Sequence, residues 1–176
     1  MSELTPCLWF FADDALDAMT RYVEVFSRYG AARVTDVTHF GEGGMRPAGT
    51  VLTVEAELDG QRVVAINGGP AGFAHSPAFS MMVLCEGAEQ VDHYWDSLVQ
   101  GGEPSQCGWL VDRWGISWQV VPRELRTWMA DPDASKAAAV DGDAADAEDR
   151  PRRPPRRLRH RLTTRESVVR AAPVSR

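Results

Sequence analysis

The chain has 176 residues, of which 25 are acidic and 19 are lysine or arginine, giving a net charge of −6 at pH 7. This length is enough for one ordinary domain, and the 44% hydrophobic content is normal for a globular protein. No stretch approaches the roughly 18 apolar residues of a membrane span, and MSELTPCLWF lacks the basic and apolar regions of a signal peptide. We therefore expect a cytoplasmic location and no membrane partner.

Charge and composition change near residue 140. Residues 1–140 carry 19 acidic and 9 basic residues, whereas residues 141–176 carry 6 acidic residues and 10 arginines. The second segment has clustered arginine and proline and no aromatic residue, so it cannot bury enough apolar surface to offset its ordering entropy. The sequence predicts one domain over residues 1–140 and a disordered Arg/Pro-rich tail over residues 141–176. Nucleic acid is not expected as a partner except through this tail.

The first predicted elements are a strand and a helix. The apolar run LTPCLWFF (4–11) predicts the strand, and segment 12–30 has the pattern of the helix. Asp13 or Asp14 can cap its start, and Gly30 can end it. Apolar residues predicted for its buried face are Leu16, Met19, Tyr22, Val23 and Phe26.

Strand patterns follow. Residues 32–40 alternate between apolar and polar side chains, and residues 41–49 (GEGGMRPAG) are typical of a loop. Residues 50–58 and 61–68 then form two apolar runs separated by the Asp-Gly dipeptide at 59–60. Asp-Gly between two such runs indicates a β-hairpin.

The second half of the domain repeats this order. A strand is predicted over 77–86, a helix over 89–102, and a hairpin from 107–112 and 115–122. The chain therefore reads β-α-β-β-β and then β-α-(short)-β-β, an internal repeat of roughly 60–70 residues. The predicted fold class is α+β with two βαβββ-type units. Each unit is expected to form a curved antiparallel sheet with one helix on its back, and the two open faces would form a cleft.

Three stretches carry a family resemblance, namely TPCLWF (5–10), LDGQRVVAINGGP (58–70) and CGWLVDRWGISWQVVP (107–122). They resemble the PhnB-like branch of the vicinal oxygen chelate superfamily, which has the glyoxalase-like fold. Many members of that branch carry the label 3-demethylubiquinone-9 3-methyltransferase. The resemblance covers about residues 3–140 and implies a homodimer, because superfamily members commonly pair.

The superfamily binds a divalent metal through four side chains, two from each unit. By resemblance, these positions fall at Cys7, at Ala65 or Asn67, at Ala78, and at Gln119, where the superfamily has its closing glutamate. At most one thiol and two amides remain, and such a donor set gives a hard divalent ion no charge compensation. We therefore predict no bound metal at this site, and the sequence assigns no cofactor.

The methyltransferase label receives little support from the residues. S-adenosylmethionine sites usually lie at a glycine-rich turn between a strand and a helix, whereas GEGG (41–44) precedes another strand. Methyl transfer stays an alternative function, together with metal-dependent lyase or dioxygenase chemistry and with a structural or regulatory dimer.

The main functional hypothesis is that the cleft binds a small, largely neutral molecule. Strand alternation groups side chains on one face of each of three strands: Cys7 and Trp9, then Ala78, Ser80 and Met82, then Ser117, Gln119 and Val121. The resemblance implies that these faces are the ligand-bearing ones. The predicted substrate-binding residues are Cys7, Trp9, Asn67, Ser80, Met82, Trp109 and Gln119. This apolar and aromatic set with few neutral polar groups suits such a ligand. The alternative, that these side chains only fill the core, is left open.

The histidines are weaker candidates. His93 is expected on a helix surface and His39 at the end of a strand. His75 would border the cleft and suits proton transfer near pH 7, but the sequence places no carboxylate beside it. The catalytic residues, if any, stay unassigned.

The cysteines and two tryptophans are expected to be structural. Cys7 could be a nucleophile if a cation lowered its pKa, although an inert thiol is favoured. Cys85 and Cys107 are expected in the core. Trp95 and Trp128 belong to predicted helices, where packing explains them.

Overall fold

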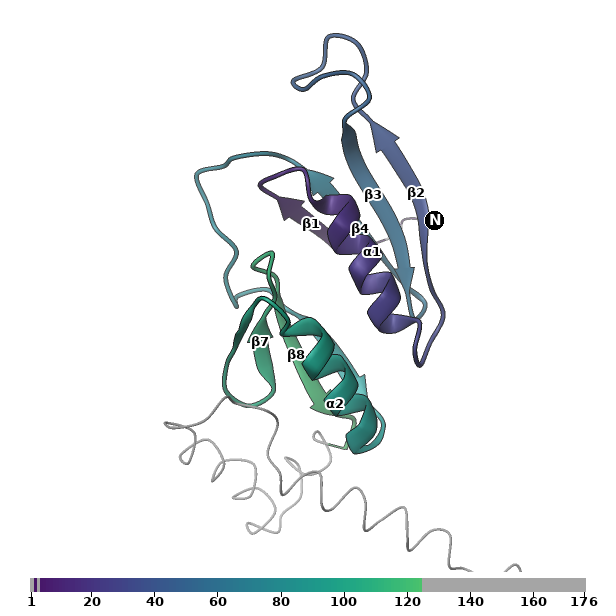
Figure 1. Cartoon of the computed structure of the whole chain (residues 1–176), viewed down its shortest axis with the longest axis vertical. Helices are drawn as coiled ribbons and strands as arrows, with labels where there is room; N and C mark the ends of the chain where they lie inside the picture. The colour runs from purple at the N-terminus through teal and green to yellow at the C-terminus, as the bar shows by residue number, and fades with distance from the viewer. Residues whose placement is uncertain (1, 3, 125–176) are drawn as a thin grey trace, which may run out of the picture. The chain divides into compact units, whose positions relative to one another are not determined.

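The computed structural model describes residue 2 and residues 4–124, which form two compact units that divide between Ala74 and His75 (Figure 1). The predicted boundary at residue 140, the tail 141–176 and Trp128 lie outside the described residues. No helix in the described part of the chain is long and apolar enough to cross a membrane.

The first unit is a four-stranded sheet with one helix. Its elements are β1 (Cys7–Phe10), α1 (Ala15–Phe26), β2 (Ala32–His39), β3 (Val51–Leu58) and β4 (Gln61–Asn67). The strand order is β1-β4-β3-β2, and α1 lies along one face of this sheet (Figure 1). The other face, here called the open face, carries no helix of this unit.

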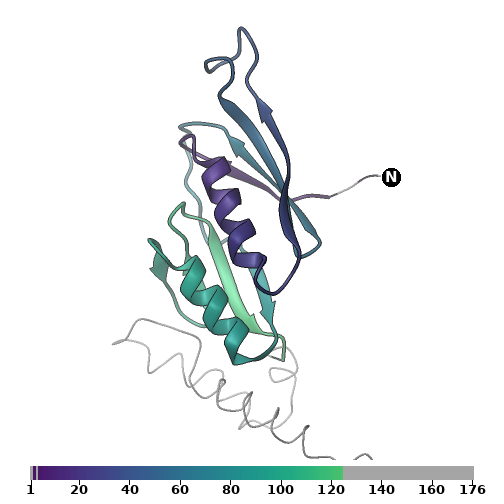
Figure 2. The ribbon, with the colours of Figure 1, turned by 45° about the vertical axis from the view of Figure 1, so that its right-hand side comes forward.

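The second unit has the same topology. Its elements are β5 (Met81–Cys85), α2 (Gly87–Leu98), β6 (Glu103–Pro104), β7 (Trp109–Val111) and β8 (Ser117–Pro122). The order is β5-β8-β7-β6, and α2 packs against β8 and β5 (Figure 2). The internal repeat and the α+β class predicted from the sequence are confirmed, element for element.

The sheets are mixed, and not purely antiparallel as expected. β1 pairs with β4 in parallel, and β5 pairs with β8 in parallel, while the remaining neighbours are antiparallel. The helix of each unit carries the chain back across the sheet, so that the next strand runs in the same direction as the first. Two hairpins then return the last strand to that direction, next to the first strand.

Helix α1 begins differently from the prediction. Asp14 is the N-cap residue, yet its side chain makes no capping hydrogen bond. The Asn67 side chain supplies the acceptor, because its Oδ1 accepts a hydrogen bond of 3.0 Å from the Ala15 backbone N–H. The buried face also differs, since Leu16 is exposed and Val23 is half-buried. The buried residues are Ala15, Ala18, Met19, Tyr22, Val25 and Phe26.

The hairpin between β3 and β4 matches the prediction. Asp59 and Gly60 have φ values of 49° and 81°. Positive φ at both central residues is the requirement of a type I′ turn, which Asp-Gly satisfies at little cost. This turn fixes the register in which β3 and β4 pair.

The core of the second unit lies between its sheet and α2. Trp118, Leu110 and Val120 of the sheet are buried, as is Trp95 of the helix. Cys85 is also buried, and this burial raises the pKa of its thiol to about 12 despite the opposing charge of Arg123. The prediction of a core position is thus confirmed for Cys85.

Cys107 is not in the core, so that expectation is wrong. It is exposed in the turn before β7, where its φ is 54°. Gly108 follows with φ 82°, and a Cβ there would lie 2.6 Å from the Val120 carbonyl oxygen. The chain needs this tight turn to bring β7 onto β8, which leaves the Cys107 side chain outside.

Candidate functional site

The open face of the second sheet brings four of the predicted site residues together. Gln119 of β8 pairs with Met82 of β5 on one side and with Trp109 of β7 on the other. Residues paired across neighbouring strands point to the same side of a sheet. The thioether of Met82, the amide of Gln119 and the indole of Trp109 therefore form one row across three strands.

Ser80 completes this group. It lies directly before β5, and its Oγ accepts a hydrogen bond of 2.8 Å from Nε2 of Gln119. Gln119, Ser80 and Trp109 are half-buried, and the side chain of Met82 is exposed. We call Ser80, Met82, Trp109 and Gln119 the Gln119 row.

The neighbours of Gln119 along β8 are buried. Ser117 and Val121 share its side of the strand by alternation. The Ser117 hydroxyl is buried and makes no hydrogen bond within the described part of the chain. Such a group costs about 1–3 kcal/mol unless water or a ligand satisfies it. Ala78, the predicted opening position of this unit, is exposed in the segment before β5.

Asp112 fixes the turn that leads into β8. Its Oδ1 accepts hydrogen bonds from the backbone N–H groups of Trp114 (2.9 Å) and Ile116 (3.0 Å), and its Oδ2 accepts one of 2.8 Å from Trp118 Nε1. The carboxylate thus anchors a tryptophan on the helix side of β8, directly before Gln119. Sequence reasoning identified this turn but missed Asp112 as its organiser, although an Asp at the head of a turn commonly accepts a hydrogen bond from the backbone N–H two residues on.

His75 lies next to this turn. A Cβ on Gly115 would lie 3.5 Å from Cδ2 of His75, so the imidazole packs against the turn backbone. His93 lies on α2, half-buried, with its ring 5.2 Å from the Tyr94 ring. His39 is exposed at the end of β2. The positions of His93 and His39 are the ones expected from the sequence, and the expectation that His75 borders the cleft stays a prediction.

The open face of the first sheet carries Cys7 and Trp9, which pair with Val64 and Ile66 of β4. Partial burial raises the pKa of the Cys7 thiol above its ordinary value, so the thiolate is disfavoured. Among residues 4–124, burial is the cause of this shift and no cation opposes it, which supports an inert thiol.

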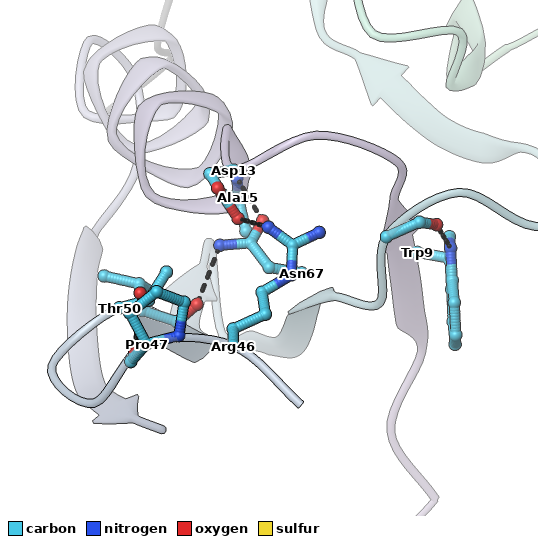
Figure 3. Close-up of polar contacts among 9 residues, drawn as sticks. Trp9, Asp13, Ala15, Arg46, Pro47, Thr50 and Asn67 are labelled. Carbon is cyan, nitrogen blue, oxygen red and sulfur yellow. Dashed lines mark hydrogen bonds and ion pairs between the residues drawn. The ribbon is translucent and has the colours of Figure 1, made fainter. Parts of the chain in front are cut away.

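The Trp9 side chain packs against the backbone of Gly68 and Gly69. Its Nε1 donates a hydrogen bond of 3.0 Å to the Gly69 carbonyl oxygen (Figure 3). A Cβ on Gly68 would lie 2.1 Å from Cζ2 of Trp9, so only glycine fits beneath the ring. Phe73 contacts the indole edge-on, with ring centroids 5.6 Å apart. The sequence singled out Trp9 but not the glycines that position it.

Asn67 does not share this face, and the expectation that it lines the site with Cys7 and Trp9 is wrong. It pairs with Phe10, so it points toward α1 and is 1% exposed. Its Oδ1 accepts from the Ala15 N–H, and its Nδ2 donates to the Val51 carbonyl oxygen at 3.0 Å (Figure 3). Both halves of the amide are thereby used to join the helix start to β3. Ala65, the other candidate position, is also buried on the helix side.

The first open face is also more charged than predicted. Arg62 of β4 forms an ion pair with Glu55 of β3, and Arg33 of β2 forms one of 2.5 Å with Glu57 of β3. The expected apolar character holds only near β1, because β2 and β3 place their alternate charged residues on this side. The second sheet keeps the neutral character that the sequence indicated.

An ion pair that sequence reasoning missed lies beside the N-terminal end of α1. Arg46, from the glycine-rich loop between β2 and β3, binds Asp13 at the start of α1 (Figure 3). The guanidinium lies against Gly69, since a Cβ there would lie 2.9 Å from Nη2. A long side chain in an irregular loop gives no periodic signal, so its target could not be read from the sequence.

The metal-ligand positions inferred by resemblance hold no cluster of ligand side chains. Among residue 2 and residues 4–124, no group of three or more histidine, cysteine, aspartate and glutamate side chains could hold a metal ion. The absence of bound metal stays a prediction, which rests on the chemistry of Cys7, Ala78 and Gln119.

Two βαβββ units of identical topology define the glyoxalase-like fold class, and comparison with known proteins agrees. The family model described as 3-demethylubiquinone-9 3-methyltransferase matches residues 2–121, so the chain belongs to this family. The resemblance to the PhnB-like branch of the vicinal oxygen chelate superfamily is thereby confirmed. None of the curated proteins compared with the chain matches it.

Two solved structures illustrate the similarity. The PhnB protein from Bacillus cereus is 29% identical with a TM-score of 0.60, and the match covers 67% of this chain and 97% of that protein. The protein PA1353 from Pseudomonas aeruginosa is 15% identical with a TM-score of 0.54, covering 67% of this chain and 95% of that protein. The second likeness shows the fold alone.

Proposed function

We propose that the protein binds a small, largely neutral molecule at the Gln119 row, with no metal ion at that position. One observation carries this proposal. By resemblance, Gln119 occupies the position of the superfamily's closing glutamate, and its amide is half-buried, hydrogen-bonded to Ser80, and flanked in register by Met82 and Trp109. An uncharged, partly apolar surface with one convergent polar group is typical of a small-molecule site.

The chemistry of the row favours a neutral ligand over a metal ion. Hard divalent ions bind through several oxygen ligands, with carboxylates supplying the charge compensation, whereas this row offers a thioether, an indole, a hydroxyl and an amide. A charged ligand would lose hydration here without meeting an opposite charge in the row. Neutral ligands avoid that loss.

We assign no catalytic step to the protein. The family's description names a methyltransferase, but the described strands offer no glycine-rich strand-to-helix turn for S-adenosylmethionine: β1 leads into α1 through residues 11–14, FADD. Calorimetry with S-adenosylmethionine decides this alternative, and tight binding would favour methyl transfer. A homodimer stays a prediction from the resemblance, which light scattering of the purified protein would check.

Metal analysis and ligand screening of the full chain test the proposal. We expect substoichiometric Mn, Fe, Ni and Zn, and a rise in melting temperature with neutral aromatic compounds, which Gln119→Ala reduces. Stoichiometric metal that disappears in Gln119→Ala would overturn the metal-free site and favour lyase or dioxygenase chemistry. If no neutral compound stabilises the protein, the structural or regulatory role is favoured.

A further inference from the structure

We propose that the ligand of the Gln119 row presents an uncharged planar amide or lactam edge to the Gln119 side chain, an inference that rests on the proposed function. A primary amide has two N–H donors and one carbonyl acceptor. Within the described residues, one donor of Gln119 is used on Ser80 Oγ at 2.8 Å. In this proposal Ser80 takes the N–H trans to Oε1, so that the remaining N–H lies beside the Oε1 lone pairs. This donor and acceptor match the edge of a second amide in two hydrogen bonds.

The flanking side chains favour a flat apolar body attached to that amide. Met82 and Trp109 are the register partners of Gln119, so they lie one strand spacing away on either side. An indole face and a thioether both attract an aromatic ring, through stacking and sulfur–aromatic contact. Met82 is 53% exposed, so the row has apolar surface left to cover.

The charges around the row favour an amide over the corresponding acid. On the open face of this sheet, the described strands place one charged residue, Glu103, at the far edge in β6, where it pairs with Val111. A carboxylate ligand would lack the donor that Oε1 requires, and it would meet no cation in the row. An acceptor-only ketone would satisfy the Gln119 N–H but leave Oε1 without a donor.

The first sheet provides an internal contrast. Its parallel pair places Cys7 opposite Val64 and Trp9 opposite Ile66, with no amide on the open face at these positions. The ion pair of Arg62 with Glu55 lies further along the same face. Recognition of a neutral amide is therefore specific to the second unit.

Titration of the full chain with three compounds of equal size tests this inference: benzamide, benzoate and acetophenone. Binding is followed by heteronuclear NMR, and we expect benzamide to bind about tenfold more tightly than the other two, because about one to two neutral hydrogen bonds separate them. Gln119→Met keeps the side-chain length, and we expect it to remove this preference. Gln119→Glu keeps the shape and the acceptor but loses the donor, and we expect a similar loss. Gln61→Met on the exposed start of β4 is the matched control and should behave as wild type.

The outcomes separate the inference from the proposed function. If the three compounds bind at the Gln119 row with equal affinity, or if benzoate binds most tightly, the amide inference is wrong while small-molecule binding stands. If none of them, and no other neutral aromatic compound, shifts the resonances of the row, both fail. An unchanged benzamide preference in folded Gln119→Met also overturns the inference.

Discussion

Replacing Asn67 with alanine removes the side chain that ties the start of α1 to the start of β3. The substitution breaks two hydrogen bonds of 3.0 Å, a buried one from the Ala15 N–H and a part-buried one to the Val51 carbonyl oxygen. Each contributes about 1 kcal/mol, and the buried Ala15 N–H is left without this partner. Loss of a helix cap alone costs about 0.5–2 kcal/mol. We therefore expect Asn67→Ala to lower the free energy of unfolding by about 2–4 kcal/mol.

Urea denaturation followed by tryptophan fluorescence measures this change, with the same analysis applied to Gln61→Ala. Gln61 is exposed on the same strand, so its replacement should stay within about 0.5 kcal/mol of wild type. Asn67→Asp keeps an acceptor for the Ala15 N–H but loses the donor to Val51, so an intermediate loss is expected. A loss for Asn67→Ala as small as that of Gln61→Ala would refute the bridging role.

Three further predictions concern stability and pH. Gly68→Ala should destabilise the protein by about 1–3 kcal/mol through collision with Trp9, and the loss should be smaller in a Trp9→Ala background. Gly72→Ala is the control and should be neutral, because a Cβ there meets nothing within 4 Å. Equal losses of stability at both glycines would contradict the packing of Gly68 against Trp9. Asp112→Ala should cost about 3 kcal/mol in urea denaturation, because three hydrogen bonds to the carboxylate are lost, two of them buried. A change below about 1 kcal/mol would argue against its role in the turn. Burial raises the pKa of the Cys85 thiol to about 12, so the thiol stays protonated in the folded protein at pH 9–11 while the unfolded chain loses this proton. The free energy of unfolding should therefore fall as pH rises through this range. The fall should be steeper than in Cys85→Ala by about 1.4 kcal/mol per pH unit. Parallel pH–stability curves for the two proteins would contradict this prediction, because they would show that folding does not raise the pKa of the Cys85 thiol.

Much of the fold follows from local signals in the sequence. The Asp-Gly pair at 59–60 predicts the type I′ turn, because few residues tolerate two positive φ values in succession. Alternation along β8 predicts that Gln119 and Trp118 lie on opposite faces, as they do. The order of strands and helices then repeats, which is sufficient to identify the two units. Parallel pairing of β1 with β4 leaves no local signal, because it depends on where the helix returns the chain.

The candidate site is predictable only in part, and Asn67 shows why. Its place near the end of an apolar strand fits a site residue and a helix cap equally well. The choice depends on which face of β4 meets α1, and a shift of one residue exchanges the faces. Arg46 and Gly68 act through contacts with residues far along the chain, so neither gives a periodic pattern. Ser80, Met82, Trp109 and Gln119 share one face of the second sheet. Alternation groups Ser80 with Met82 along one strand, and the resemblance indicates that this face and the face of Gln119 belong together.

The most direct measurement is a heteronuclear NMR titration that follows the Gln119 side-chain amide and the Trp109 indole N–H. Benzamide should shift both signals in a saturable manner, and one equivalent of Mn²⁺ should leave their intensities unchanged. Selective broadening of these two signals by Mn²⁺, with no shift on addition of benzamide, would contradict a neutral, metal-free site at Gln119.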